Sequence, residues 1–344
     1  MTRTRPARPH RAGALALAAG LALPLLAACS EDDPADLVIY SGRSEELVGG
    51  IVEEFEEQED LTVEVRYGDT AELAAQLMEE GDDTPAQVFF SQDAGALGAL
   101  SNEGLLARLD EDDVQRVPET YASQDGDWVG VTGRVRVIAY DPDQVDESEL
   151  PDDVLDLADE EWAGRVAIPP TNASFQSFIT ALRVTEGEDV ARQFLEDLIA
   201  NDVETYEHNL AILDALEAGE VEVGLINHYY LHERKVELGE ENVRTQLKFL
   251  PPGTAGALVN VAGVGIIEGA EDDADAQAFV DFLLSDDVQA EFVEVTGEYP
   301  LVPGVDGPSD LPTLEELRGG ARMDLSELDS LQETVALLTE VGLI

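Results

Sequence analysis

Strand-like and helix-like segments alternate from Leu37 onward, and this alternation is what most constrains the fold. The apolar run 37–40 predicts a strand, residues 44–59 carry an apolar stripe at helical spacing, and residues 61–65 predict the next strand. A strand–helix–strand order of this kind builds a parallel sheet with helices packed on it. We therefore expect an α/β fold in which polar turns after the strands gather at one edge of the sheet.

The alternation is interrupted and then restarts, which predicts two lobes. Residues 128–131 and 134–140 are expected to be extended segments that leave the first lobe, and a second series of strands and helices begins at Gly164. A long apolar strand over 258–267 then leads back. The predicted parts are lobe 1 over 37–134 and 259–310, lobe 2 over 135–258, and a helical C-terminal segment over 311–344 with a terminal helix at 324–341.

The N-terminus has the features of an export signal. Arginines precede a largely apolar segment over 12–28, shorter than the ~20 residues that a membrane-spanning helix needs. Residues 26–29 (LAAC) resemble the bacterial lipobox, in which the cysteine is acylated and becomes the new N-terminus. We expect a signal peptide over 1–28, lipid attachment at Cys29, an acidic linker over 29–36, and a place on the cell membrane facing outside the cytoplasm.

The charge balance excludes nucleic acid as a partner. The chain has 75 Asp and Glu against 19 Lys and Arg, for a formal net charge of -56. Such a surface repels polyanions and is typical of an acidic proteome adapted to high ionic strength, where charges are screened beyond about 3 Å at 1 M salt. With 44% hydrophobic residues, the chain can still bury substantial cores.

Two adjacent tyrosines follow the predicted strand 221–226. On a continuing strand Tyr229 and Tyr230 would point to opposite faces, but a helical pattern begins after Asn227 and ends at Gly239. The tyrosines are therefore expected in the first turn of a helix, where both phenols can face one ligand at the carboxyl end of a strand. The alternative is an aromatic pair that packs the start of a helix.

Catalytic motifs are not expected. His228 and His232 have the i, i+4 spacing of some metal sites, but no third nitrogen or sulfur ligand accompanies them, so we favour structural roles. The sequence has no GxSxG motif, no phosphate loop and no cysteine nucleophile after position 29. We therefore predict that the protein is not an enzyme.

From Leu37 to about Pro303 the sequence resembles the iron(III) ABC transporter substrate-binding proteins. The resemblance is carried by seven ordered segments: 38–43 (VIYSGR), 91–97 (SQDAGAL), 132–137 (TGRVRV), 170–175 (PTNASF), 206–209 (YEHN), 226–230 (INHYY) and 298–301 (EYPL). It implies a two-lobed periplasmic-binding-protein-like fold with a ligand cleft between the lobes. It also implies capture of ferric iron or a ferric chelate for an ABC permease and ATPase complex.

In that family the adjacent tyrosines supply phenolate oxygens to Fe(III), which by position are Tyr229 and Tyr230 here. The family often adds a histidine and a glutamate from the first lobe, but those places hold Ser44 and Gln92. Because neither is anionic, the remaining ligands are expected to be carbonate or another anion, with water. Ser44, Gln92 and Tyr40 are candidate pocket walls; Tyr40 is also a candidate third phenolate, although its place inside a strand favours a core role.

The resemblance places the anion at the loop of Asn172, Ala173 and Ser174, ahead of a helix whose free N–H groups favour negative charge. By position Asn209 and Asn227 would assist, and Arg134 would neutralise the anion. The alternatives are that Ser174 only caps its helix and that Arg134 pairs with an acid. Asn209 is expected in either case to cap the helix 209–218.

Three alternatives remain open at this point, and one of them is a surface lipoprotein that keeps the fold but has lost the transport function. The same fold could bind another small solute, such as a polyamine, a phosphonate or an organic anion, because Ser44 and Gln92 can hydrogen-bond an organic ligand. An enzyme with its active site in the cleft is the alternative of another class.

Overall fold

The computed structural model describes residues 35–254, 256–318, 325, 328 and 330–344. The strands are β1 (Leu37–Ser41), β2 (Val63–Tyr67), β3 (Val88–Ser91), β4 (Val129–Tyr140), β5 (Val166–Ile168), β6 (Glu204–Thr205), β7 (Val223–Asn227), β8 (Gln246–Phe249), β9 (Val259–Ile266) and β10 (Tyr299–Pro300). The predicted signal peptide, Cys29 and most of the acidic linker lie outside the described residues.

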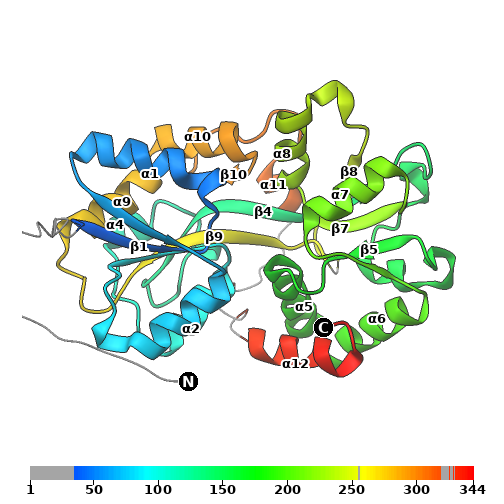
Figure 1. Cartoon of the computed structure of the whole chain (residues 1–344), viewed down its shortest axis with the longest axis horizontal. Coiled ribbons are helices and arrows are strands. Elements are labelled where there is room, and N and C mark those ends of the chain that lie inside the picture. Colours follow the sequence, from blue (N-terminus) through cyan, green and yellow to red (C-terminus); the bar gives the residue numbers. More distant parts are fainter. Residues whose placement is uncertain (1–34, 255, 319–324, 326–327, 329) are drawn as a thin grey trace, which may run out of the picture. The chain divides into compact units, whose positions relative to one another are not determined.

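Helices cover the strands and form the connections between them (Figure 1). They are α1 (Glu45–Glu59), α2 (Thr70–Glu80), α3 (Ala94–Asn102), α4 (Glu111–Val114), α5 (Ala173–Thr185), α6 (Glu188–Ala200), α7 (Asn209–Ala218), α8 (Tyr229–Leu238), α9 (Ala274–Leu283), α10 (Asp286–Thr296), α11 (Leu314–Arg318) and α12 (Leu331–Val341). Within the described ranges, no helix is both long enough and apolar enough to span a membrane.

Local sequence explains where the helices that frame the site begin. In α1 the apolar stripe that includes Val48, Ile51 and Phe55 is buried, as the spacing predicts. Helix α2 begins after Asp69, whose carboxylate accepts hydrogen bonds from the N–H groups of Ala71 and Glu72. These two helices follow β1 and β2, so their N-termini lie at the carboxyl ends of parallel strands.

The strands follow the order β2-β1-β3-β9-β4-β7-β5-β6, and β4 changes partners along its length. Its first half pairs with β9 through Val135, and its second half pairs with β7 from Arg136 onward. We call the part with β1–β3, α1–α3, α9 and α10 lobe 1, and the part with β5–β8, α5–α8 and α12 lobe 2. Strand β4 therefore contributes to both lobes, as the α/β two-lobed prediction requires.

Each lobe has its own hydrophobic core. In lobe 1, the ring of Phe279 packs edge-on against Phe55 at 5.1 Å between centroids, within a core that also includes Phe90. Lobe 2 is filled from α5, α6 and β7, and Leu337 and Leu338 of α12 are buried in the same cluster. The C-terminal helix therefore stabilises lobe 2.

Three expectations about the elements need correction. The two extended segments around Gly133 are one strand: Leu301 and Tyr299 lie 3.2 and 3.4 Å from the position that a Cβ would take at Gly133, so a glycine is needed for close packing and does not end the strand. Strand β8 was not predicted. The terminal helix predicted at 324–341 is observed at 331–341, residues 324, 326–327 and 329 lie outside the described residues, and Leu325 and Leu328 pack in the core of lobe 1.

We expect Phe279→Ala to lower the free energy of unfolding by about 3–5 kcal/mol, because it removes a ring that touches Phe55 and leaves a cavity in the core of lobe 1. Urea denaturation measures the change. Val236→Ala is the control, since Val236 is 70% exposed and its loss should shift stability by less than about 0.5 kcal/mol. Equal effects of the two substitutions would contradict the assigned core.

Candidate functional site

A pocket of about 650 Å³ is lined by residues of both lobes at the carboxyl ends of their strands. Lobe 1 contributes Ser44 and Gln92, from the turns after β1 and β3. Lobe 2 contributes Tyr229 and Tyr230 at the start of α8 and the loop 171–174 before α5. The structure therefore brings the tyrosine pair, two of the candidate wall residues and the candidate anion loop to one place.

Strand β7 ends at Asn227, His228 is the N-cap residue, and helix α8 begins at Tyr229, so both tyrosines lie in the first turn as predicted. Their rings stack with centroids 4.2 Å apart and an interplanar angle of 29°. Burial raises the pKa of Tyr229 well above its usual value, and the neighbouring Tyr230 adds to this. Burial also raises the pKa of Tyr230. At neutral pH both phenols therefore keep their protons.

Gln92 connects the two lobes at this pair. Its Nε2 donates a hydrogen bond of 3.1 Å to the hydroxyl of Tyr229. The other side-chain atom, Oε1, is buried and has no hydrogen-bond partner among the described residues. Gln92 is therefore a neutral donor to the phenol oxygen, with an acceptor left over.

Tyr40 lies elsewhere. Its ring is fully buried in the core of lobe 1, and its hydroxyl accepts a hydrogen bond of 2.7 Å from Arg66 and donates one of 3.0 Å to Glu80. Tyr40 is absent from the described residues that line the pocket. Tyr40 therefore has the core role that its place inside a strand favours.

The loop before α5 is organised by Asn172. The side chain of Asn172 caps α5 by accepting from the N–H of Ser174 at 3.1 Å, and it also accepts from the hydroxyl of Ser174 at 2.6 Å. Asn209, at the start of α7, donates a hydrogen bond of 3.1 Å to the same oxygen. The Oδ1 atom of Asn209 is buried and without a hydrogen-bond partner among the described residues. Asn172, Ser174 and Asn209 therefore form one polar group beside Ala173.

The expected capping role of Asn209 is wrong by one residue. Helix α7 begins at Asn209, and its cap is His208, whose Nδ1 accepts from the N–H of Ala211 at 3.1 Å. Because Asn209 is already helical, its side chain is free to reach Asn172. Asn227, the last residue of β7, is buried and is not among the described lining residues of the pocket.

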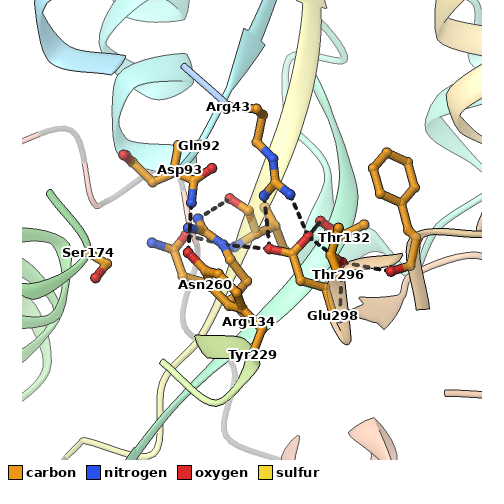
Figure 2. Close-up of polar contacts among 12 residues, drawn as sticks. Arg43, Gln92, Asp93, Thr132, Arg134, Ser174, Tyr229, Asn260, Thr296 and Glu298 are labelled. Atoms are coloured by element: carbon orange, nitrogen blue, oxygen red, sulfur yellow. Dashed lines mark hydrogen bonds and ion pairs between the residues drawn. The ribbon is translucent and has the colours of Figure 1, made fainter. Parts of the chain in front are cut away.

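Arg134 does not reach the anion loop. It is almost fully buried on β4, where its Nη2 donates to the carbonyl of Val261 at 3.2 Å and its Nε lies 3.9 Å from the Glu298 carboxylate. Figure 2 shows the contact between Arg134 and Glu298, and no contact is drawn between Arg134 and Ser174. Arg134 therefore pairs with an acid, as the alternative interpretation of the sequence expected, and this acid, Glu298, is buried.

Glu298 and Arg43 form a buried ion pair that the sequence analysis did not assign to the site. Both Arg43 Nη atoms donate to the carboxylate, at 2.9 and 2.8 Å, and Thr132 adds a third bond of 2.8 Å (Figure 2). Burial acts to raise the pKa of Glu298, but Arg43, Arg134 and Thr132 together outweigh it and the net shift is downward. The carboxylate is therefore ionised under all ordinary conditions.

Arg136 is the second residue that sequence reasoning missed. Its guanidinium donates to the carbonyl of Ser174 and, at 3.3 Å, to the carbonyl of Leu225, and it lies over the ring of Phe178. No described carboxylate pairs with it. Burial lowers the pKa of Arg136 to about 9, so it still carries its charge at neutral pH. An unpaired positive charge therefore lies directly behind the anion loop.

The histidines have structural roles, as favoured from the sequence. His228 Nδ1 accepts from the N–H of Val135 at 3.1 Å, and its Nε2 lies 3.0 Å from the carbonyl of Gly297. Burial lowers the pKa of His228 to about 4, which keeps it neutral. In the part of the chain that the structure describes, no three His, Cys, Asp or Glu side chains form a group that could hold a metal ion.

Comparisons with known proteins identify the family of this chain. A family model described as bacterial extracellular solute-binding protein matches residues 83–318. The Fe(3+)-binding periplasmic protein of Serratia marcescens is 30% identical over 334 residues, covering 96% of this chain and 98% of that protein. The major ferric iron-binding protein of Neisseria meningitidis serogroup B is 30% identical over 311 residues, with 90% and 93% covered.

Solved structures give the same result. Iron-bound HitA from Pseudomonas aeruginosa has a TM-score of 0.84 and 32% identity, covering 89% of this chain and 99% of that one. A Trichodesmium protein in complex with iron and citrate ligands has a TM-score of 0.75 and 27% identity, covering 89% and 99%. These relatives are binding proteins and not enzymes. The chain belongs to the family of bacterial extracellular solute-binding proteins, and its resemblance to the ferric-binding members is confirmed.

Proposed function

We propose that this protein captures Fe(III) together with an anion in the pocket between the lobes and delivers it to the permease and ATPase complex of an ABC importer. The observation that carries the proposal is the stacked pair Tyr229 and Tyr230 in the same pocket as the loop 172–174. The names of the relatives, which are ferric iron-binding proteins, support the choice of metal.

The chemistry of the pocket fits a hard, highly charged cation. Fe(III) prefers oxygen ligands, and its charge can displace the protons of Tyr229 and Tyr230. The charges of Arg134 and Arg43 act to lower the pKa of Tyr229 against its burial, so they assist this ionisation. Two phenolates leave one positive charge on Fe(III), and carbonate or another anion at the α5 N-terminus would offset it, with water completing the ligand set.

Ligand binding is proposed to select the state in which the lobes meet. Gln92 of lobe 1 donates to Tyr229 of lobe 2, so closing the lobes places a neutral donor against the phenol oxygen. A cation held by the tyrosines and an anion held by loop 172–174 would add contacts that exist only in this state. The proposed hinge lies where β4 changes partners, between Val135 and Arg136, which supports lobe boundaries near residues 134 and 259.

The protein is proposed to act outside the cytoplasm as a lipoprotein. Signal peptide 1–28, acylation of Cys29 and the linker 29–36 would tether the two lobes to the membrane beside the permease. The remaining parts are lobe 1 over 37–134 and 259–310, lobe 2 over 135–258 and the C-terminal segment 311–344. Membership in a family of extracellular solute-binding proteins supports this placement.

We expect Tyr229→Phe and Tyr230→Phe each to weaken iron binding by more than about a hundredfold, since even loss of an outer-shell partner can cost that much. Each change removes an oxygen ligand and leaves the ring in place. The phenolate-to-iron absorption band, followed during titration with ferric iron in bicarbonate, measures the loss. Tyr206→Phe is the control because Tyr206 is not among the described lining residues. Unchanged binding by the double variant, or a thermal shift with a polyamine or phosphonate alone, would contradict the iron assignment.

Iron binding should weaken as the pH falls. The pKa values of Tyr229 and Tyr230 are raised by burial, so both phenols are protonated before binding and must release about two protons to become ligands. The apparent affinity is then expected to drop by about a hundredfold per pH unit below neutrality. Calorimetry in two buffers of different ionisation enthalpy counts the protons. Release of no proton by the wild type would argue against phenolate ligation.

The anion group offers a matched pair of substitutions. Asn209→Ala should reduce the effect of added carbonate or phosphate on iron affinity by about tenfold, since it removes a group worth roughly 1.4 kcal/mol at the anion loop. It should leave α7 intact, because the cap comes from His208. His208→Ala should show the reverse: a loss of about 1 kcal/mol of stability with the anion effect retained. Iron titrations with and without the anion, beside thermal unfolding, separate the two results.

A further inference from the structure

From the contacts of the C-terminal residues, we infer that they form a stop that limits how far the two lobes can separate. We call Leu325, Leu328 and residues 330–341 the strap. Leu325 and Leu328 pack in the core of lobe 1, whereas α12 packs in the core of lobe 2. The inference concerns the motion of the lobes alone, and it holds for any ligand of the pocket.

The strap is attached to lobe 2 through α5, the helix that begins at the pocket. Arg183 of α5 donates hydrogen bonds of 2.9 Å to the carbonyl of Ser330 and 2.8 Å to the hydroxyl of Thr334. The hydroxyls of Thr180 and Thr334 lie 2.7 Å apart and share a hydrogen bond. Helix α12 packs against α5 and α6 (Figure 1). The start of α12 therefore moves together with α5.

The strap is attached to lobe 1 at the first turn of α3. Leu325 and Leu328 are 2% and 1% exposed within the core of lobe 1. The carbonyl oxygen of Leu328 lies 2.7 Å from the position that a Cβ would take at Gly95, so this approach requires a glycine. Gly95 follows Gln92 by three residues, and Gln92 donates to Tyr229. The strap therefore contacts lobe 1 beside the turn that reaches the tyrosines.

Very little chain separates the two attachments. A single residue lies between Leu328, which contacts lobe 1, and Ser330, which is hydrogen-bonded to lobe 2. A chain spans at most about 3.6 Å per residue, so the Cα atoms of Leu328 and Ser330 cannot be more than about 7 Å apart. While both attachments hold, α3 and α5 can therefore move apart only slightly at this place.

The strap adds a connection between the lobes to those made by the sheet. Strand β4 passes from lobe 1 to lobe 2, and the chain returns between β8 and β9. A hinge motion must leave every such connection nearly in place, so an additional short connection narrows the range of motions. Wide opening requires Leu325 and Leu328 to leave the core of lobe 1 and become exposed to water. The strap therefore limits the range of the motion, and a ligand selects a position within that range.

The test lengthens the strap and removes none of its contacts. Gly-Ser-Gly-Ser is inserted directly before Ser330 in the full-length chain, which adds a reach of about 13 Å. Spin labels are attached at Glu72→Cys on α2 and Gln193→Cys on α6, both exposed positions, and Cys29→Ser removes the one native cysteine. Double electron–electron resonance on the metal-free protein measures the distances between the lobes. The insertion should lengthen the mean distance by at least about 5 Å, which the added reach permits.

Matched controls separate the reach of the strap from a general loosening of the protein. The same insertion after Gly269, in an exposed turn within lobe 1, should leave the distance unchanged. Leu328→Ala weakens the attachment to lobe 1 and should also lengthen the distance, whereas Leu77→Ala, at a similarly buried position in the same core, should not. Equal distances with the original and the lengthened strap, or equal lengthening by the two alanine variants, would overturn the inference. Because no iron is present, neither result would bear on the proposed function.

Discussion

The site depends on the buried carboxylate of Glu298. It accepts both Nη atoms of Arg43, which fixes the turn after β1, and the hydroxyl of Thr132 on β4. The residue before it, Gly297, offers its carbonyl to His228, which directly precedes the tyrosine pair. Residues 297–298, directly after α10, therefore contact the turn after β1, strand β4 and the residue that precedes α8. Removing one partner of such a buried pair costs about 3–5 kcal/mol, because the other charge is left uncompensated.

The sequence was sufficient to predict the fold and the tyrosines, because both depend on local patterns. Alternating strands and helices specify α/β lobes, and the change of period after Asn227 specifies that α8 begins at the tyrosines. Loop 172–174 was found for the same reason: polar residues before an apolar helix mark an N-terminus whatever the tertiary structure. Arg43 and Glu298 could not be paired in this way, since 255 positions separate them and neither has a local signal.

The choice between Arg134 and Arg136 shows why sequence reasoning stopped short at the anion group. Side chains two residues apart on a strand point to the same face, so alternation cannot separate these two arginines. Register separates them: Arg134 pairs opposite Asn260 of β9 in lobe 1, and Arg136 pairs opposite Asn227 of β7 in lobe 2. The point at which β4 changes partners falls between them. It therefore decides which guanidinium lies by Glu298 and which lies behind Ser174, and only the assembled sheet contains that information.

The two lobe 1 residues that stand opposite the tyrosines, Gln92 and Ser44, are neutral, and this affects what can stabilise the closed arrangement of the lobes. An N–H donor at Gln92 stabilises the oxygen of Tyr229 whether it is a phenol or a phenolate, whereas a carboxylate there would repel the phenolate unless a metal lay between them. Gln92 and Ser44 thus provide no anionic ligand, and Glu46 and Asp69 of the same lobe line the pocket together with Glu207 and Glu233 of lobe 2. In the proposed function, lobe closure would then be stabilised chiefly by the cation held between the lobes. In the proposed function, loss of the cation would remove contacts that exist only in the closed state, which would favour opening.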